Sequence, residues 1–151
     1  ASGRFEEIIY KKKSSKIIID YAHTPDAMQN VLKSYTNKSF KPSLVFGCGG
    51  ERDKSKRKKM SVIANKYAKK VYLTDDNPRN ENANLIRKTL KKYCQKARDI
   101  SNRRLAIQTA ISEMHQKDIL IIAGKGHEKY QIIKNKNYLF DDFKVAKDFI
   151  K

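Results

Sequence analysis

The fold of this chain is decided by the stretch Leu44-Val-Phe-Gly-Cys-Gly-Gly-Glu-Arg-Asp53, in which three apolar residues pass directly into glycines and charges. Such a short apolar run, without alternating polar residues, is typical of a parallel strand covered on both faces. Other apolar runs of this kind are rich in β-branched residues, and together they predict one buried sheet. These runs are Ile17–Ile19, Val71–Leu73 and Ile119–Ala123.

Apolar residues recur at helical spacing between these strands, so the connections are expected to contain helices. Strands that alternate with helices of this length are typical of βαβ units. The sequence therefore predicts an α/β fold, with a Rossmann-like, doubly wound, mostly parallel sheet and helices on both of its faces. The helices are marked by Met28, Val31, Leu32 and Tyr35; by Met60, Ile63, Ala64 and Tyr67; by Ile86, Leu90 and Tyr93; and by Ile107, Ala110, Ile111 and Met114.

Smaller elements are expected at the two ends of the chain. Phe5–Tyr10 is predicted to form an edge strand ahead of the first buried strand. Tyr130–Ile133 and Tyr138–Phe140 predict a hairpin after the last one. A closing helix follows, with Asp141 or Asp142 as its N-cap.

Composition narrows the class of protein. The chain has 151 residues, 39% of them hydrophobic, and no apolar run approaches the roughly 18 residues of a membrane span. It begins at Ala1 without a start methionine, and we interpret residues 1–151 as a single domain that starts at a domain boundary. Cys48 follows a strand pattern, and Cys94 is expected on a helix face far from it in sequence. These unlike contexts predict reduced, unpaired thiols in a cytoplasmic protein.

Positive charge is the most pronounced bulk property. Thirty-four Lys and Arg against sixteen Asp and Glu give a net charge of +18. Such an excess can indicate a nucleic-acid partner. The lysines are scattered along the whole chain, however, whereas a nucleic-acid footprint would be concentrated on one element. Solvated helix faces explain them better, and a basic nucleic-acid-binding domain is kept only as a remote alternative.

Each of the four buried strands is followed at once by a compact polar or glycine-rich motif. These motifs are Asp20–Asp26, Gly47–Asp53, Asp75–Arg79 and Gly124–Glu128. In an open α/β sheet, ligands bind just outside the carboxyl ends of the strands. Turns alone do not require a special polar or glycine-rich motif at all four strand ends. The sequence therefore predicts a ligand site at this edge of the sheet.

The first motif combines helix capping with groups that capping does not explain. Thr24 or Asp26 can cap the next helix, and Pro25 suits its first turn. Asp20 and His23 have no part in the cap. Their side chains could reach a nucleotide base or ribose.

The second motif joins backbone freedom to positive charge. Gly47, Gly49 and Gly50 allow the backbone to approach a ligand closely, and six of the eight residues from Arg52 to Lys59 are basic. Cations at a helix N-terminus oppose the helix dipole, so an anionic ligand would relieve the conflict. The spacing of a Walker P-loop occurs nowhere in the chain.

The last two motifs carry groups suited to an amino acid, although each can also be a plain turn or loop. Asn77 offers a donor and an acceptor, and Arg79 offers a planar fork for a carboxylate. Glu128 could supply the counter-charge for an ammonium group. His115 is expected to close a helix, where a histidine is a routine cap, and it is given no role.

In this order and spacing the four motifs resemble the C-terminal domain of the Mur ligases. The resemblance covers essentially the whole chain and is closest to members that add meso-diaminopimelate to UDP-N-acetylmuramoyl-L-alanyl-D-glutamate. Asp20-Tyr-Ala-His-Thr-Pro-Asp26 and Gly124-Lys-Gly-His-Glu128 carry it, and Asp76-Asn-Pro-Arg79 is the pattern of diaminopimelate-adding members. The resemblance implies that ATP phosphorylates the D-Glu carboxylate and that the amine of diaminopimelate then attacks the acyl phosphate.

The resemblance also implies residue roles, none of them catalytic and none a metal ligand. The positions that match the amino-acid site are Arg52, Asn77, Arg79, Gly124 and Glu128. The positions that match the ATP side are Arg4, Asp20 and His23. The P-loop and Mg²⁺ ligands belong to a central domain, and the uridine-binding region to an N-terminal domain, neither of which this chain contains. A monomeric enzyme of peptidoglycan precursor synthesis is implied, without nucleic-acid or membrane partners, and this domain is expected to be inactive alone.

Two related proteins remain as alternatives within this architecture. The first is a Mur ligase that uses L-lysine or another amino acid. The second is a folylpolyglutamate synthase, a family that shares the architecture but lacks the Asn77-Pro-Arg79 context.

Overall fold

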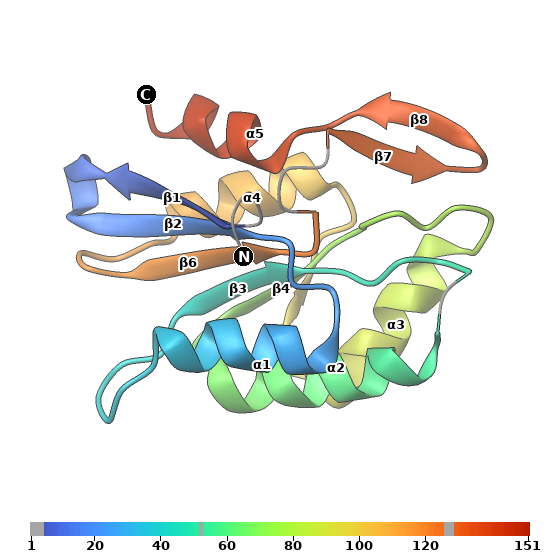
Figure 1. Cartoon of the computed structure of the whole chain (residues 1–151), viewed down its shortest axis with the longest axis horizontal. Coiled ribbons are helices and arrows are strands. Elements are labelled where there is room, and N and C mark those ends of the chain that lie inside the picture. The colour runs from blue at the N-terminus through green and yellow to red at the C-terminus, as the bar shows by residue number, and fades with distance from the viewer. Residues whose placement is uncertain (1–4, 52, 126–128) are drawn as a thin grey trace.

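A six-stranded sheet with the order β1-β2-β6-β3-β4-β5 forms the centre of the computed structural model, which describes residues 5–51, 53–125 and 129–151 (Figure 1). β1 pairs antiparallel with β2, and the other pairs are parallel. This confirms the predicted mostly parallel sheet with an edge strand at its start. The strands are β1 (Phe5–Tyr10), β2 (Ser15–Asp20), β3 (Ser43–Phe46), β4 (Val71–Leu73), β5 (Arg98–Asp99) and β6 (Ile119–Ala123).

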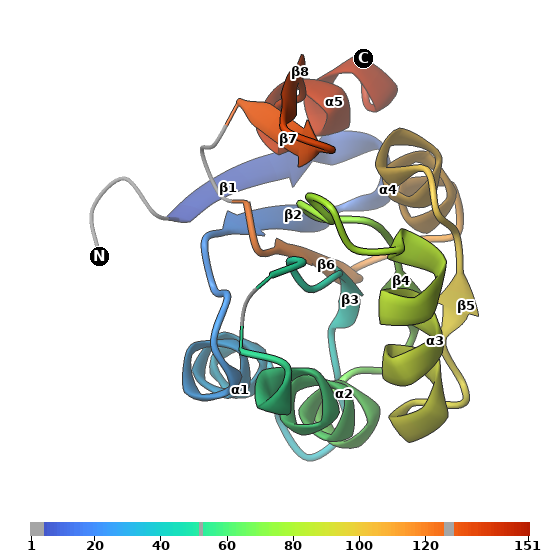
Figure 2. The ribbon, with the colours of Figure 1, turned by 90° about the vertical axis from the view of Figure 1, so that its right-hand side faces the viewer.

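Helices cover both faces of this sheet, as the turned view shows (Figure 2). One face carries α1 (Pro25–Ser34), α2 (Ser55–Tyr67) and α3 (Ala83–Tyr93). The other carries α4 (Arg103–Ser112) and α5 (Asp142–Phe149). A short 3₁₀ helix, η1 (Lys11–Lys13), links β1 to β2, and a separate hairpin is formed by β7 (Tyr130–Ile133) and β8 (Lys136–Leu139).

The apolar strands have no polar alternation because each face of the sheet needs its own core. Neighbouring residues of a strand point to opposite faces. In β6, Ile121 joins the core under α1, α2 and α3, whereas Ile122 joins the core under α4 and α5. Both side chains are fully buried, and each such burial stabilises the fold by about 1.5–3 kcal/mol.

Helix starts follow the expected capping chemistry. Thr24, and not Asp26, caps α1: its Oγ1 accepts from the Ala27 amide at 3.2 Å. Asp141 caps α5 by accepting from the amides of Phe143 and Lys144. The two alternatives left open by the sequence are thereby decided.

Four expectations are corrected in detail. α4 ends at Ser112, so Met114 lies beyond the helix although it is buried in the core. His115 follows the helix without capping it, and its amide donates to Asp118 at 2.8 Å. Cys94 stands just after α3, as the residue that ends it. The second hairpin strand is shifted to Lys136–Leu139 because a tight turn at positions 134 and 135, both with positive φ, brings pairing closer to β7.

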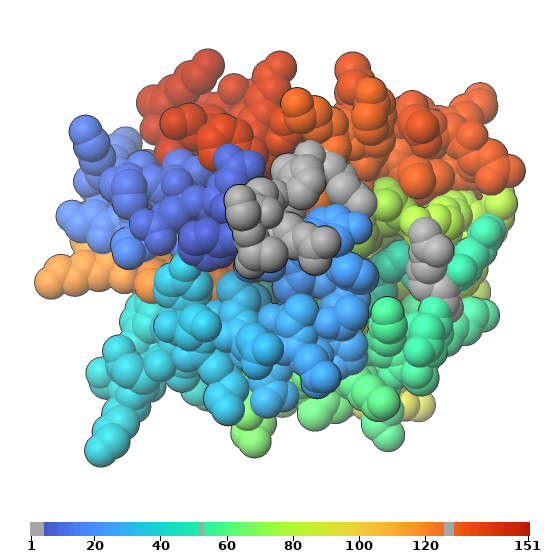
Figure 3. Space-filling view, in the orientation of Figure 1, coloured from blue at the N-terminus to red at the C-terminus, as the bar shows by residue number. Residues whose placement is uncertain are grey.

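The strand β5 was not expected, because two exposed polar residues carry no apolar pattern. It is held by Arg87, a buried side chain of α3 whose guanidinium binds Asp99 on β5 and Asp75 after β4. None of the described helices is long and apolar enough to cross a bilayer. In the space-filling view, the hairpin and α5 lie along one side of the molecule and α1 along the opposite side (Figure 3).

Candidate functional site

The carboxyl ends of β2, β3, β4 and β6 meet at one edge of the sheet, and a cavity of about 320 Å³ opens there. All four sequence motifs contribute to its wall. Residues that line it include His23, Gly49, Asn77, Arg79 and Gly124. The structure therefore brings together most of the described site residues that the sequence singled out.

The glycine-rich loop after β3 is packed against the loop after β4. The amide of Gly50 donates to the carbonyl of Asn77 at 2.8 Å. A Cβ on Gly50 would lie 1.9 Å from the carbonyl oxygen of Pro78, and one on Gly47 would lie 2.1 Å from that of Thr74. Two glycines are therefore required by close contact between protein backbones, rather than by a ligand as the sequence suggested.

Part of the charge at the start of α2 is neutralised within the protein. Arg57 is buried, donates to both carboxylate oxygens of Glu81 at 2.9 and 3.1 Å, and also binds the carbonyl of Gly49. Hydrogen bonds from Arg57 and from the amide of Glu51 lower the pKa of Glu81 to about 2. This cation therefore needs no anionic ligand, whereas Lys56 lines the cavity.

Arg79 is held in place by the hairpin. Its φ is 54°, a left-handed conformation that is uncommon for a side chain of this size. The Arg79 amide donates to the carbonyl of Ile132, and the Arg79 carbonyl accepts from the amide of Lys134. Nη1 donates to the carbonyls of Gly50 and Asn77, at 3.0 and 3.1 Å. Among the described residues, no partner is seen for Nε and Nη2, which leaves that edge of the guanidinium for a ligand.

Asn77 and Gly124, which both line the cavity, are linked by the residue that follows Gly124. The side chain of Lys125 is fully buried, and its Nζ donates to Oδ1 of Asn77 at 2.9 Å. Gly124 has a φ of 115°, a conformation open mainly to glycine, which turns the chain at the end of β6. A buried lysine was not anticipated, because the motif by itself predicts only a loop.

The first motif places His23 on the cavity wall, whereas Asp20, the last residue of β2, is not among the described residues that line the cavity. The Asp20 carboxylate accepts from the Ala22 amide at 2.8 Å, and burial raises the pKa of this carboxyl group above its usual value. The ring of His23 meets that of Tyr21 edge to face, with centroids 4.8 Å apart. Tyr21 also lines the cavity and was missed, since the sequence gives no sign of which way it points.

Comparison with known proteins assigns this arrangement to a family. The family described as "Mur ligase, glutamate ligase domain" matches residues 3–126. The chain belongs to the Mur ligase family.

Relatives within the Mur ligase family agree with that assignment. The chain is 47% identical, over 154 aligned residues, to UDP-N-acetylmuramoyl-L-alanyl-D-glutamate--2,6-diaminopimelate ligase of Rickettsia rickettsii. This alignment covers 99% of the present chain and 31% of the Rickettsia protein. A solved structure with the same enzyme name superposes with a TM-score of 0.88 at 38% identity, over 99% of this chain and 31% of that one. The chain thus spans about a third of the length of these relatives.

A more distant structure shares only the fold. Folylpolyglutamate synthase from Thermotoga maritima superposes with a TM-score of 0.58 at 22% identity, covering 81% of this chain and 27% of that one. The Rossmann-like α/β architecture is therefore common to both groups, as the sequence indicated.

A buried ion pair links α4 and α5 close to the ends of β4 and β6. Arg103 at the start of α4 donates to both carboxylate oxygens of Asp142 at 2.8 Å, and both side chains are fully buried. Arg103 also donates to the carbonyls of Asp75 and Ala123, at the ends of β4 and β6. The sequence offered Asp142 only as a helix cap, because a contact between residues 39 positions apart has no local pattern.

Three of the expected site residues, Arg4, Arg52 and Glu128, lie outside the described residues. Within the described ranges, no group of three or more His, Cys, Asp and Glu side chains could hold a metal ion. Cys48 and Cys94 are both free thiols, as predicted. Burial, and then the charge of Asp76, raise the pKa of Cys48 to about 12.

Proposed function

We propose that this chain is the amino-acid-binding domain of the ligase that adds meso-diaminopimelate to UDP-N-acetylmuramoyl-L-alanyl-D-glutamate. The observation that carries the proposal is the placement of Asn77, Arg79 and Gly124 on one cavity wall, with an edge of the Arg79 guanidinium that no described residue binds. The relatives named for this reaction, at up to 47% identity, support the same substrate.

The chemistry of the cavity suits the part of diaminopimelate that lysine lacks. Diaminopimelate carries a second carboxylate at its far end, and a guanidinium edge binds a carboxylate through two parallel hydrogen bonds. With lysine in the cavity, the open edge of Arg79 would face no partner, and a site with unpaired polar groups discriminates strongly. Arg52, Gly124 and Glu128 complete the proposed amino-acid site.

The remaining parts of the reaction are assigned to the rest of a longer protein. We place Arg4, Asp20 and His23 on the ATP side of the cleft. The phosphates of ATP, Mg²⁺ and the UDP-N-acetylmuramoyl dipeptide would be bound mainly by the domains that this chain lacks. The described residues fit no metal site, so no step is assigned to a metal ion here. We expect a cytoplasmic monomer whose isolated C-terminal domain has no activity.

The test is ligation by the full-length protein with meso-diaminopimelate, L-lysine and a set of other amino acids, each supplied with ATP, Mg²⁺ and the UDP-linked dipeptide. The proposal expects kcat/KM for diaminopimelate to exceed that for lysine by about a hundredfold or more. Preference for lysine would establish the alternative Mur ligase and contradict the proposal.

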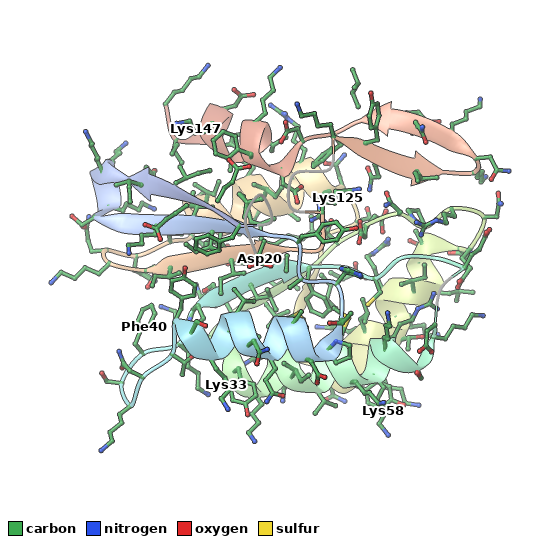
Figure 4. The ribbon with its side chains drawn as sticks, in the orientation of Figure 1. Asp20, Lys33, Phe40, Lys58, Lys125 and Lys147 are labelled. Carbon is green, nitrogen blue, oxygen red and sulfur yellow. The ribbon has the colours of Figure 1, made fainter. Side chains whose placement is uncertain are left out.

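The nucleic-acid alternative gains no support from the distribution of charge. Lys33, Lys58 and Lys147 are exposed, and Figure 4 shows Lys33 and Lys58 on the side of α1 and α2 and Lys147 on the opposite side, at α5. A binding footprint would gather such side chains on one surface.

A further inference from the structure

Lys125 is a buried cation whose ammonium group meets three acceptors from two other segments. Nζ donates to Oδ1 of Asn77 at 2.9 Å and to the carbonyl of Tyr130 at 2.6 Å. It forms an ion pair with Oδ1 of Asp76 at 3.4 Å. Figure 4 shows Lys125 between the hairpin and the sheet. An ammonium group has three donors, and the hydrogen bonds to Asn77 and Tyr130 use two of them.

The contact with Lys125 determines which polar group of Asn77 is available to a ligand. Its side-chain oxygen accepts from Lys125 and also from the amide of Ile132, at 2.8 Å. Rotating the amide group by half a turn would place its NH₂ against two donors, so the orientation is fixed by its partners. The oxygen is thereby occupied, and the NH₂ is the polar group of Asn77 that a ligand can use.

We propose that Lys125 is a positioning residue of the amino-acid site: it holds the oxygen of Asn77 so that this side chain acts only as a hydrogen-bond donor toward an acidic group of the ligand. The proposal deepens, and rests on, the proposed function. It also replaces the expectation that Asn77 serves as both donor and acceptor. Lys125 itself touches no substrate.

Lysine suits this position because a neutral donor would leave the carboxylate of Asp76 uncompensated. Oδ1 of Asp76 is buried and has no hydrogen bond among the described residues, so its compensation is the charge of Lys125. The position therefore requires both a donor and a positive charge.

The first test is Lys125→Met in the full-length ligase, with KM measured separately for meso-diaminopimelate and for ATP. We expect the KM for diaminopimelate to rise about ten- to a hundredfold, because Asn77 loses the charged donor that fixes its side chain toward the ligand, while the KM for ATP changes less than threefold. Lys136→Met, at an exposed hairpin position, is the matched control and should change neither value. Equal increases for both substrates would overturn the proposal, because they would indicate a general loss of structure.

A double-mutant cycle asks whether Lys125 acts through Asn77. In an Asn77→Ala background, Lys125→Met should raise the KM for diaminopimelate less than twofold, because the group that Lys125 positions is gone. An effect as large as in the wild-type background would contradict the proposal.

Asn77→Asp provides a test that does not depend on the folding of Lys125→Met. It keeps the oxygen that accepts from Lys125 and Ile132, and it replaces the NH₂ with a charged oxygen. The melting temperature should hold, while the KM for diaminopimelate should rise at least tenfold through repulsion of the acidic group. An unchanged or lower KM would show that Asn77 faces an ammonium group and would overturn the inference. Failure of the wild-type protein to use diaminopimelate would instead contradict the proposed function itself.

Discussion

Arg79 combines an uncommon backbone conformation with a guanidinium that the described residues bind through Nη1 alone. Left-handed φ values cost a bulky residue about 1–2 kcal/mol, and here the hairpin holds the residue in place through two backbone hydrogen bonds. Nη1 is fixed on two carbonyls. The guanidinium is thus pre-positioned, which in the proposed function would lower the entropic cost of binding a carboxylate.

Arg79→Ala should therefore decide between substrates. Loss of one partner of a shielded, charge-assisted pair costs about 2–5 kcal/mol, or roughly a 30- to 5000-fold fall in kcat/KM for diaminopimelate in the full-length enzyme. Activity with lysine should fall little, and Arg79→Lys should restore only part of the loss, since a point charge cannot reproduce the fork. Steady-state kinetics with both amino acids checks this. If both values fell equally, Arg79 would be structural.

Gly50→Ala should destabilise the chain, because the two loops that meet at Gly50 have no room for a methyl group. The added Cβ would stand 1.9 Å from a backbone oxygen of Pro78, so one of the two loops must move. Such overpacking costs about 1–3 kcal/mol, or roughly 2–10 °C in melting temperature. Lys88→Ala on the exposed side of α3 is the control and should stay within about 0.5 kcal/mol. An unchanged melting temperature for Gly50→Ala would mean that the loops are further apart.

Cys48 should react slowly with alkylating reagents although its side chain is only partly covered. A pKa of about 12 leaves very little thiolate at pH 8, where a free cysteine is already substantially ionised. We expect alkylation at least about a hundredfold slower than that of free cysteine, followed by mass spectrometry. Denaturation should expose two thiols. Rapid modification of the native protein would contradict the described environment of Cys48.

At the scale of elements, what the sequence predicted and what it missed have a common explanation. The strands Ile17–Ile19 and Ile119–Ala123 were found because burial on both faces leaves a local apolar signature. The motifs were located because each directly follows such a strand. The contacts that shape the site, such as Arg57 with Glu81, join residues far apart in sequence and leave no local pattern.

The same limit applies to the direction of side chains. Asn77 was recognised as a site residue by its motif and resemblance, but the use of its oxygen by Lys125 follows only from the packed structure. The sequence therefore located the cavity and most of its wall. Which polar atoms of a side chain remain available to a ligand could be determined only from the contacts between loops.

The ion pair between Arg57 on α2 and Glu81 ahead of α3 should appear in the pH dependence of stability. The pKa of Glu81 is lowered from 4.5 to about 2, so its stabilising effect is complete above about pH 4.5 and is lost as the pH falls through 2. Glu81→Gln should therefore be less stable than wild type at pH 5, with the difference narrowing toward pH 2. Urea unfolding at several pH values measures it.

Glu7→Gln is the control for this experiment. Glu7 on β1 forms a longer, exposed pair with Lys16 at 3.6 Å, which contributes little. Its difference from wild type should stay small across the range. A Glu81→Gln difference that did not change with pH would rule out the lowered pKa.

At the scale of the whole molecule, the cavity is one wall of a larger active site in the proposed function. The chain covers 31% of its relatives, and its sequence has no P-loop. We expect the purified chain to release no phosphate from ATP above a heat-treated control and to bind ATP weakly, because few contacts leave little surplus after the cost of association. Measurable turnover, or submicromolar binding by calorimetry, would reveal a phosphate site within this chain.

The strand order has a consequence for the synthesis of the protein. β6 lies between β2 and β3, yet it is the last strand of the sheet to be made. At roughly 5–20 residues per second, the ribosome completes β6 about 4–15 s after β3. Until then β2 and β3 have no partner between them, and each presents unpaired backbone groups of the kind that promote aggregation. We therefore expect the nascent chain to be most prone to aggregation in the interval that ends when β6 emerges.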